Sequence, residues 1–365
     1  METDETSTNI TDEFFTSSET LYPYPELVFC ATGFAILSVT ALVGNSLVLI
    51  AVARHRQLQN ATNVFVVNLS VTDCLTGFAF LWSIPGMVSR TPGYPLPFAF
   101  PCVASAAIVF STVGCSMYTL ANIAINRLVL ITQPMETYRS VYTHRKIAVM
   151  VFISWLIPTT GIVLPPSLGI GDVGFDIESR TCSDIDGHPK AGLYDKIQFA
   201  TLYPVPFLVI IIAYVLILKH VRRHFKKTRR AFTPKSSMVI ASAPASSATR
   251  LDDDGPTPAP RSGTSLNHAE SIRKLSLNRT RNDQLEITKN LFVVVCALVV
   301  CFTPLSIMVV TKNNRYQLYG GLVLFVSSCI NPLIYATKHP HFKPVLRSML
   351  RCRCPPVLSK IRHGP

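Results

Sequence analysis

Residues 101–134 read PCVASAAIVFSTVGCSMYTLANIAINRLVLITQP, and Arg127 is the only charged residue among them. As an α-helix, the part from Cys102 to Arg127 would be about 37 Å long, a little more than the roughly 30 Å hydrocarbon core of a bilayer. The segment therefore predicts a membrane-spanning helix with a thiol at one end and an arginine at the other.

Six further segments of the chain are as apolar and nearly as long. We expect spans at 26–52, 63–88, 103–131, 147–168, 197–218, 288–311 and 317–337. Continuous apolar runs favour helices, because the strands of a membrane barrel would alternate in polarity. With 48% hydrophobic and 15% charged residues, the sequence predicts an all-α membrane protein, a seven-transmembrane helix bundle over 26–337, and argues against a soluble protein.

The charge distribution predicts how the bundle sits in the membrane. Residues 1–53 hold seven acids and no Lys or Arg, whereas residues 338–365 hold seven Lys or Arg and no acid. By the positive-inside rule the N-terminus is extracellular and the C-terminus cytoplasmic, which fits a multi-pass protein of the plasma membrane. No signal peptide is evident, so the first span is expected to direct insertion. The net charge of +13 then indicates contact with anionic membrane lipid, and we expect no nucleic-acid partner.

The polar segments outside the bundle divide into four regions. Residues 1–25 predict a disordered extracellular tail, with Asn9 in a glycosylation sequon, and residues 223–283 predict a disordered third cytoplasmic loop. Residues 338–350 predict a short amphipathic eighth helix on the membrane surface, followed by a cytoplasmic tail at 351–365. Cys352 and Cys354 in that tail are candidates for palmitoylation, with unmodified thiols as the alternative.

A few polar and special residues inside the spans indicate sites. Asp73 is the only acid within the seven apolar cores, and an ionisable group there is a functional candidate, although a neutral structural carboxyl is the alternative. Asn45 needs a partner on another helix. Cys182, in the loop after the fourth span, is the expected disulfide partner of Cys102, because both lie at the oxidising outer end.

Taken together, the motifs resemble the rhodopsin-like (class A) G-protein-coupled receptors across all seven spans. The resemblance rests on these residues in the family's order: Gly44-Asn45, Leu69-Ser70-x-x-Asp73, Cys102, Arg127, Trp155, Pro206 with Tyr214, Cys301-Phe302-x-Pro304 and Asn331-Pro332-x-x-Tyr335. Within the family, the chain is similar to the group of moody, trapped-in-endoderm and melatonin receptors, chiefly through NIAINRLVLIT at 122–132.

The resemblance implies a mechanism and its residues. An extracellular ligand would act on heterotrimeric G-proteins through an outward swing of the sixth helix, with arrestin and receptor kinases as further partners. No cofactor is required, but the family's allosteric sodium ion would be held by Asn45, Asp73, Ser116, Ser327, Ser328 and Asn331. The activation switch would comprise Asn126, Arg127, Pro206, Tyr214, Phe302, Pro304, Pro332 and Tyr335.

Asn126 departs from the family pattern, because an acidic residue usually precedes the arginine. Gln284 likewise stands near the foot of the sixth span, where a Glu is common, with the nearby Glu286 as an alternative acid. Without these carboxylates Arg127 loses its nearest restraint, and we expect a weakly latched resting state with appreciable basal signalling.

The ligand pocket is expected to be apolar. Val109 occupies the position at which amine receptors carry Asp, so an aminergic ligand is not expected, and a lipid-like or neutral aromatic ligand is favoured. Arg180 and Lys312 in the loops could meet an anionic head group. The candidate wall residues, which could alternatively only pack the bundle, are Val109, Phe110, Val113, Gln198, Leu202, Leu305, Ser306, Val309, Gly321 and Phe325.

Features of two other classes of membrane protein can be sought in the sequence. Gly169-Ile170-Gly171-Asp172 and Tyr194-Asp195 match the motifs of intramembrane aspartyl proteases, but their order is reversed and both lie in an expected outer loop. A multi-pass transporter would show paired internal repeats, which the sequence lacks. We therefore expect a receptor and not an enzyme.

Overall fold

The computed structural model describes residues 20–231, 296–297, 299–304, 307, 311, 314–339 and 341–351. Several expectations lie outside these residues: those for Asn9 in the N-terminal tail, for most of the third cytoplasmic loop and the sixth span, and for Leu305, Ser306, Val309, Lys312, Cys352 and Cys354.

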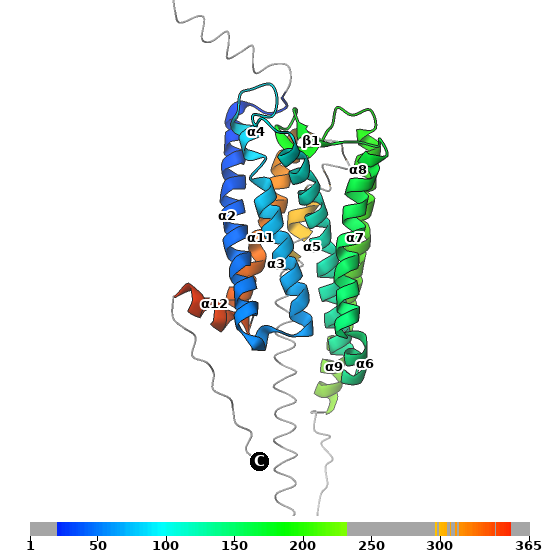
Figure 1. The fold of residues 1–365 in the computed structure, drawn as a ribbon. Coiled ribbons are helices and arrows are strands. Elements are labelled where there is room, and N and C mark those ends of the chain that lie inside the picture. The colour runs from blue at the N-terminus through cyan, green and yellow to red at the C-terminus, as the bar shows by residue number, and fades with distance from the viewer. Residues whose placement is uncertain are drawn as a thin grey trace, which may run out of the picture.

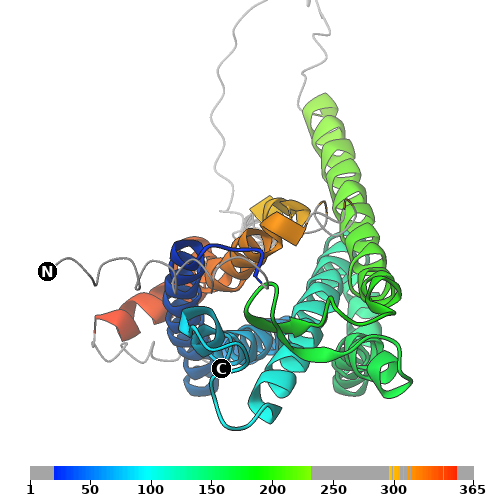
Figure 2. The same ribbon diagram turned by 90° about the horizontal axis from the view of Figure 1, so that it is seen from above.

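The described residues form a bundle of long helices with a small hairpin across one end (Figures 1 and 2). The long helices are α2 (Tyr24–Arg54), α3 (Ala61–Phe80), α5 (Phe100–Thr132), α7 (His144–Ser167), α9 (Pro204–Ala231) and α11 (Gln317–Lys338). The shorter elements are η1 (Arg56–Leu58), α4 (Ile84–Val88), α6 (Met135–Val141), α8 (Ala191–Leu202), η2 (Asn314–Tyr316) and α12 (Phe342–Leu350). Strands β1 (Val173–Asp176) and β2 (Thr181–Asp184) pair antiparallel.

Six segments of the described residues are long and apolar enough to cross a membrane, and they coincide with the first five expected spans and the seventh. The outward faces carry large apolar side chains, for example Ile36 and Phe152, which are 61% and 63% exposed. Polar residues such as Asp73, 2% exposed, are instead inside. Apolar side chains outside and polar side chains inside suit a protein surrounded by lipid, because only the protein interior offers hydrogen-bond partners.

Helix α5 lies at the centre of the bundle, packed against α3, α7, α9 and both strands. Gly114 permits the close approach on one side, since a side chain there would collide with Pro158 of α7 and Leu202 of α8. The apolar segment around Arg127 is therefore the helix against which most other elements pack.

Three expected helices differ from the structure in continuity or bounds. The second span, expected over 63–88, is divided between α3 and α4 at residues 81–83. The fifth span, expected to be continuous over 197–218, is interrupted between α8 and α9 at Tyr203. Pro204 and Pro206 explain the interruption, because each lacks the backbone donor for a helical bond to the preceding turn. The eighth helix begins at Phe342 rather than residue 338, since α11 continues to Lys338 and His339 is extended (ψ 122°).

Candidate functional site

The outer end of the bundle is closed by the β1–β2 hairpin. Cys182 of β2 forms the expected disulfide with Cys102 in the first turn of α5, with a Cα–Cα distance of 5.1 Å. Phe175 of β1 stands opposite Cys182 in the register. The disulfide therefore fixes the hairpin over the outer ends of the helices.

Arg180, in the turn of the hairpin, has a different role from the one expected. Its side chain is 5% exposed and donates hydrogen bonds to the backbone oxygens of Gly86, Ser89 and Thr91 at 3.2, 2.6 and 2.8 Å. The guanidinium satisfies carbonyls at the end of α4 and in the following loop, and it does not face the cavity as a site for an anionic head group.

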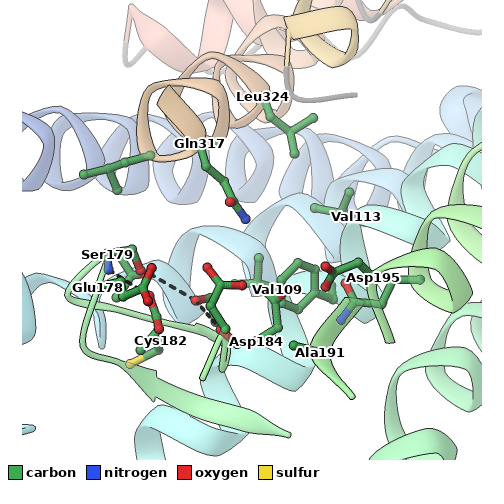
Figure 3. Close-up of a pocket in the computed structure, with 18 of the residues that line it drawn as sticks. Val109, Val113, Glu178, Ser179, Cys182, Asp184, Ala191, Asp195, Gln317 and Leu324 are labelled. Atoms are coloured by element: carbon green, nitrogen blue, oxygen red, sulfur yellow. Dashed lines mark hydrogen bonds between the residues drawn. The ribbon is translucent and has the colours of Figure 1, made fainter. Parts of the chain in front are cut away.

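Beneath the hairpin is a cavity of about 390 Å³ (Figure 3). Of the expected ligand contacts within the described residues, Phe325 does not line it. Phe325 is 2% exposed and packs against Phe34 and Phe80, behind the wall. The expected residues that do line the cavity are Val109, Phe110, Val113, Gln198, Leu202 and Gly321.

The side of the cavity next to the hairpin is acidic, which the sequence analysis missed. Figure 3 shows Asp184 between Glu178 and Asp195, with Gln317 pointing toward it from α11. The acids on the cavity wall are Asp176, Glu178, Asp184, Asp186 and Asp195. They come from the two strands, the turns after them and α8, and they meet where the hairpin and α8 line the same cavity. An excess of acids in the loop was the one signal in the sequence.

Burial and mutual repulsion shift the titration of these acids. Desolvation and the neighbouring Asp195 and Asp186 raise the pKa of Asp184 well above its usual range. Desolvation, followed by Asp176, Asp195 and Glu178, raises the pKa of Asp186 to about 6. A positive charge placed among these groups would be favoured.

In the middle of the bundle, Asp73 is surrounded by neutral polar groups from two other helices. Asn331 Nδ2 donates to Asp73 Oδ2 at 2.9 Å. Asn45 Nδ2 donates to the backbone oxygen of Ser328 at 3.0 Å. The Ser116 hydroxyl is 2.8 Å from the hydroxyl of Thr72, the residue that precedes Asp73 in the chain. Ser327 is also in the interior, 9% exposed.

At the inner end, Asn126 bonds to residues that the sequence analysis did not consider. Its Oδ1 accepts from the Thr62 hydroxyl at 3.1 Å, and its Nδ2 donates to the Tyr138 hydroxyl at 3.2 Å. Asn126 is fully buried. These neutral bonds join α5 to α3 and α6, and nothing in the sequence marked Thr62 or Tyr138 as its partners.

The other expected switch residues lie around Arg127 or closer to the cavity. Arg127 is 5% exposed, and Tyr138, Tyr214 and Tyr335 lie close enough to interact with its charge. Phe302 contacts Tyr203 edge-on, with ring centroids 5.7 Å apart. Pro304 lies in the described helical residues 299–304, and Pro332 lies inside α11.

The protease-like motif forms a turn. Gly169 and Gly171 have φ of 71° and 77°, values that favour glycine, and Asp172 is exposed before β1. Asp195 lies on the cavity wall instead. The glycines are therefore explained by backbone conformation.

Comparison with known proteins agrees with this architecture. Residues 44–335 match the family described as 7 transmembrane receptor (rhodopsin family). The chain is 24% identical to the G-protein coupled receptor moody of Drosophila pseudoobscura pseudoobscura, over 96% of this chain and 58% of moody. It is 26% identical to protein trapped in endoderm-1 of Drosophila melanogaster, over 91% of this chain and 80% of that protein. The chain spans little more than half the length of moody.

Among solved structures, squid rhodopsin has the same fold, with a TM-score of 0.68 at 18% identity, covering 91% of this chain and 87% of that one. The family match extends over most of the chain and includes the cavity, Asp73 and the surroundings of Arg127. The chain therefore belongs to the rhodopsin family of seven-transmembrane receptors, which are multi-pass proteins of the plasma membrane.

Proposed function

We propose that this chain passes the binding of an extracellular ligand to heterotrimeric G-proteins at the cytoplasmic face. The observation that carries the proposal is the course of α5. Val109 of this helix lines the cavity, and Arg127 of the same helix is buried among tyrosines at the other end. Eighteen residues of helix separate these positions by about 27 Å.

The contacts below the cavity support an outward swing of the sixth helix as the response. Tyr203 lines the cavity and touches Phe302, which lies in the described part of the sixth span. Tyr203 also sits at the interruption between α8 and α9. A ligand that moves Tyr203 would change the packing of Phe302 and Pro304, and so bias a two-state equilibrium.

The lower wall of the cavity supports a ligand with an apolar body, either lipid-like or aromatic. Val109, Phe110 and Leu202 form part of that wall. Because Val109 has no charge, any positive group on the ligand must be bound elsewhere than in the amine receptors. Contact of the basic C-terminal segment with anionic lipid, and engagement of arrestin and receptor kinases, belong to the same proposal.

We infer further that a sodium ion binds beside Asp73 and favours the resting state. The chemistry of the site fits a hard monovalent cation, with one buried carboxylate and several neutral oxygens. The buried Oδ1 atoms of Asn45 and Asn331 have no hydrogen-bond partner among the described residues. Asp73, Asn331, Asn45 and Ser328 are the residues that would hold the ion.

Guanine-nucleotide exchange tests the proposed function. Membranes containing the full chain are assayed with each class of heterotrimeric G-protein, with and without a library of lipids, peptides and indoles. We expect exchange above background, and a decrease of about tenfold or more in Arg127→Ala. The matched control is Lys190→Ala, which removes an exposed positive charge from the outer loop.

An N-terminal epitope, detected on intact cells, measures surface expression in the same experiment. Its detection without permeabilisation also checks that the N-terminus is extracellular. Surface-expressed protein that supports no exchange, either basal or stimulated, with any G-protein would contradict the proposed function.

A further inference from the structure

The cavity carries a marked charge asymmetry. Among the described residues, its wall contains five acids and neither lysine nor arginine. Asp176, 3% exposed, is held in place because its Oδ2 accepts from the backbone nitrogen of Ser179 at 2.7 Å. Asp184 and Glu178 face the same space from other points of the hairpin (Figure 3). A negative charge is thus built into one side of the cavity.

A second observation, independent of the acids, indicates a polar ligand. Gln198 of α8 lines the cavity and is 7% exposed. Its Nε2 lies near the Tyr194 hydroxyl, which donates to the backbone oxygen of Ile162, but it makes no hydrogen bond of good geometry among the described residues. A buried donor of this kind is costly unless it is satisfied. A ligand with an acceptor oxygen, such as a carbonyl, would satisfy it.

Arg180, which lies between Glu178 and Asp184 in the sequence, is not on the cavity wall. The guanidinium of Arg180 is directed to three backbone oxygens outside the cavity. Grouped carboxylates that are partly removed from water repel one another, and an opposite charge between them relieves both the repulsion and the desolvation. The opposite wall, with Val109, Phe110 and Val113, is apolar.

We propose that the cavity binds an amphiphilic organic cation. Its positive group lies among the acids of the hairpin and α8, its acceptor oxygen faces Gln198, and its apolar body packs against α5. The proposal rests on the proposed function only in taking this cavity as the ligand site of the receptor. It replaces the lipid-like or neutral aromatic ligand that was expected from the apolar wall with one that carries a positive group.

Two matched probes isolate the charge. The choline ester of 4-phenylbutyric acid carries a permanent trimethylammonium group, a carbonyl and an aromatic body. Its 3,3-dimethylbutyl ester is the uncharged carbon isostere, and free 4-phenylbutyrate supplies a negative group. Binding is measured as thermal stabilisation of the purified full-length receptor without G-protein. We expect the choline ester to stabilise most and phenylbutyrate least.

Variants locate the positive group. Asp184→Asn and Glu178→Gln should each weaken choline-ester binding by about fivefold while changing isostere binding by less than about twofold. Asp172→Asn, an exposed acid in the same loop outside the cavity wall, is the control and should change neither. Gln198→Ala should weaken both esters alike, because both carry the carbonyl.

The pH dependence supplies a further readout. A cation binds the ionised acids best, so affinity for the choline ester should rise from pH 5.5 to 8 and affinity for the isostere should not. The carboxyl groups concerned are the cavity acids on β1 and β2, on the turns that follow these strands and on α8. Burial and mutual repulsion raise the pKa of Asp186 to about 6, and they raise the pKa of Asp184 further. The probe's own charge is constant over this range.

The outcomes are separable from those of the exchange assay. Any of four results would overturn the cation proposal. These are equal stabilisation by the two esters, stronger stabilisation by phenylbutyrate, no stabilisation by any probe, and a loss of choline-ester binding in Asp172→Asn equal to that in the cavity variants. Basal G-protein exchange would leave the proposed function standing in each of these cases. Choline-ester binding without exchange under any condition would instead contradict the function and leave the cation site in place.

Discussion

At the scale of single residues, Asn126 distinguishes the inner end of this receptor. Its amide joins Thr62 and Tyr138 through neutral hydrogen bonds. An acid at this position would add attraction to the adjacent Arg127. Both hydroxyl groups can rotate to donate to a carboxylate, so the buried site should tolerate the change.

We therefore expect Asn126→Asp to lower ligand-free nucleotide exchange by about fivefold, equivalent to about 1 kcal/mol in favour of the resting state. Exchange is compared with wild type at equal surface expression. Asn126→Ala removes the two hydrogen bonds without adding charge, and should not lower exchange. Unchanged basal exchange in Asn126→Asp would show that a missing carboxylate does not set the resting activity.

At the scale of elements, the β1–β2 hairpin depends on Arg180 as well as on the disulfide. Arg180 has φ of 58°, an uncommon value for a residue with a side chain, and its guanidinium binds three backbone oxygens. It also lies over the Phe175 ring, 5.4 Å from the centroid. These contacts compensate for the backbone conformation and attach the hairpin to α4.

Arg180→Ala should lower the stability of the outer end by on the order of 3 kcal/mol, because buried carbonyls lose charged donors. The measurement is the apparent melting temperature of the purified protein, together with the rate of proteolysis within the hairpin loop. Arg90→Ala removes an exposed arginine of the same region and serves as the control. Equal melting temperatures for the two variants would refute a structural role for Arg180.

At the scale of the whole molecule, the Asp73 site lies between the cavity and the inner end, where three helices meet. Asp73 of α3 accepts from Asn331 of α11, and Asn45 of α2 bonds to the backbone of α11. An ion bound there would hold these helices in one arrangement and so oppose activation.

The sodium concentration is raised by substituting sodium for an impermeant organic cation at constant ionic strength. Basal nucleotide exchange should then decrease by about two- to fivefold. Asp73→Asn should abolish this sodium dependence, whereas the loop variant Asp172→Asn should keep it. A sodium response of the same size in Asp73→Asn would exclude the proposed site.

Much of the architecture followed from local properties of the chain. Hydropathy located the first five spans and the seventh, because a helix in lipid must be apolar over its full length. The prolines at 204 and 206 could have indicated the interruption of the fifth span, since the missing donors are a property of the residues themselves. The pairing of Cys102 with Cys182 followed from placing both at the outer end.

The sites were less predictable, because their chemistry depends on contacts between distant residues. Asn126 meets Thr62, which is 64 residues away, and Arg180 reaches Gly86 over 94 residues. The acids of the cavity are scattered over a polar loop, and no periodicity marks which of them point inward. Hydropathy and motifs could establish the membrane helices and the family, because those depend on each residue's own preference for lipid or water. The partners of Asn126, the direction of Arg180 and the charge of the cavity arise only when the helices and hairpin pack, since a charge acts through whatever the fold places within a few ångströms of it.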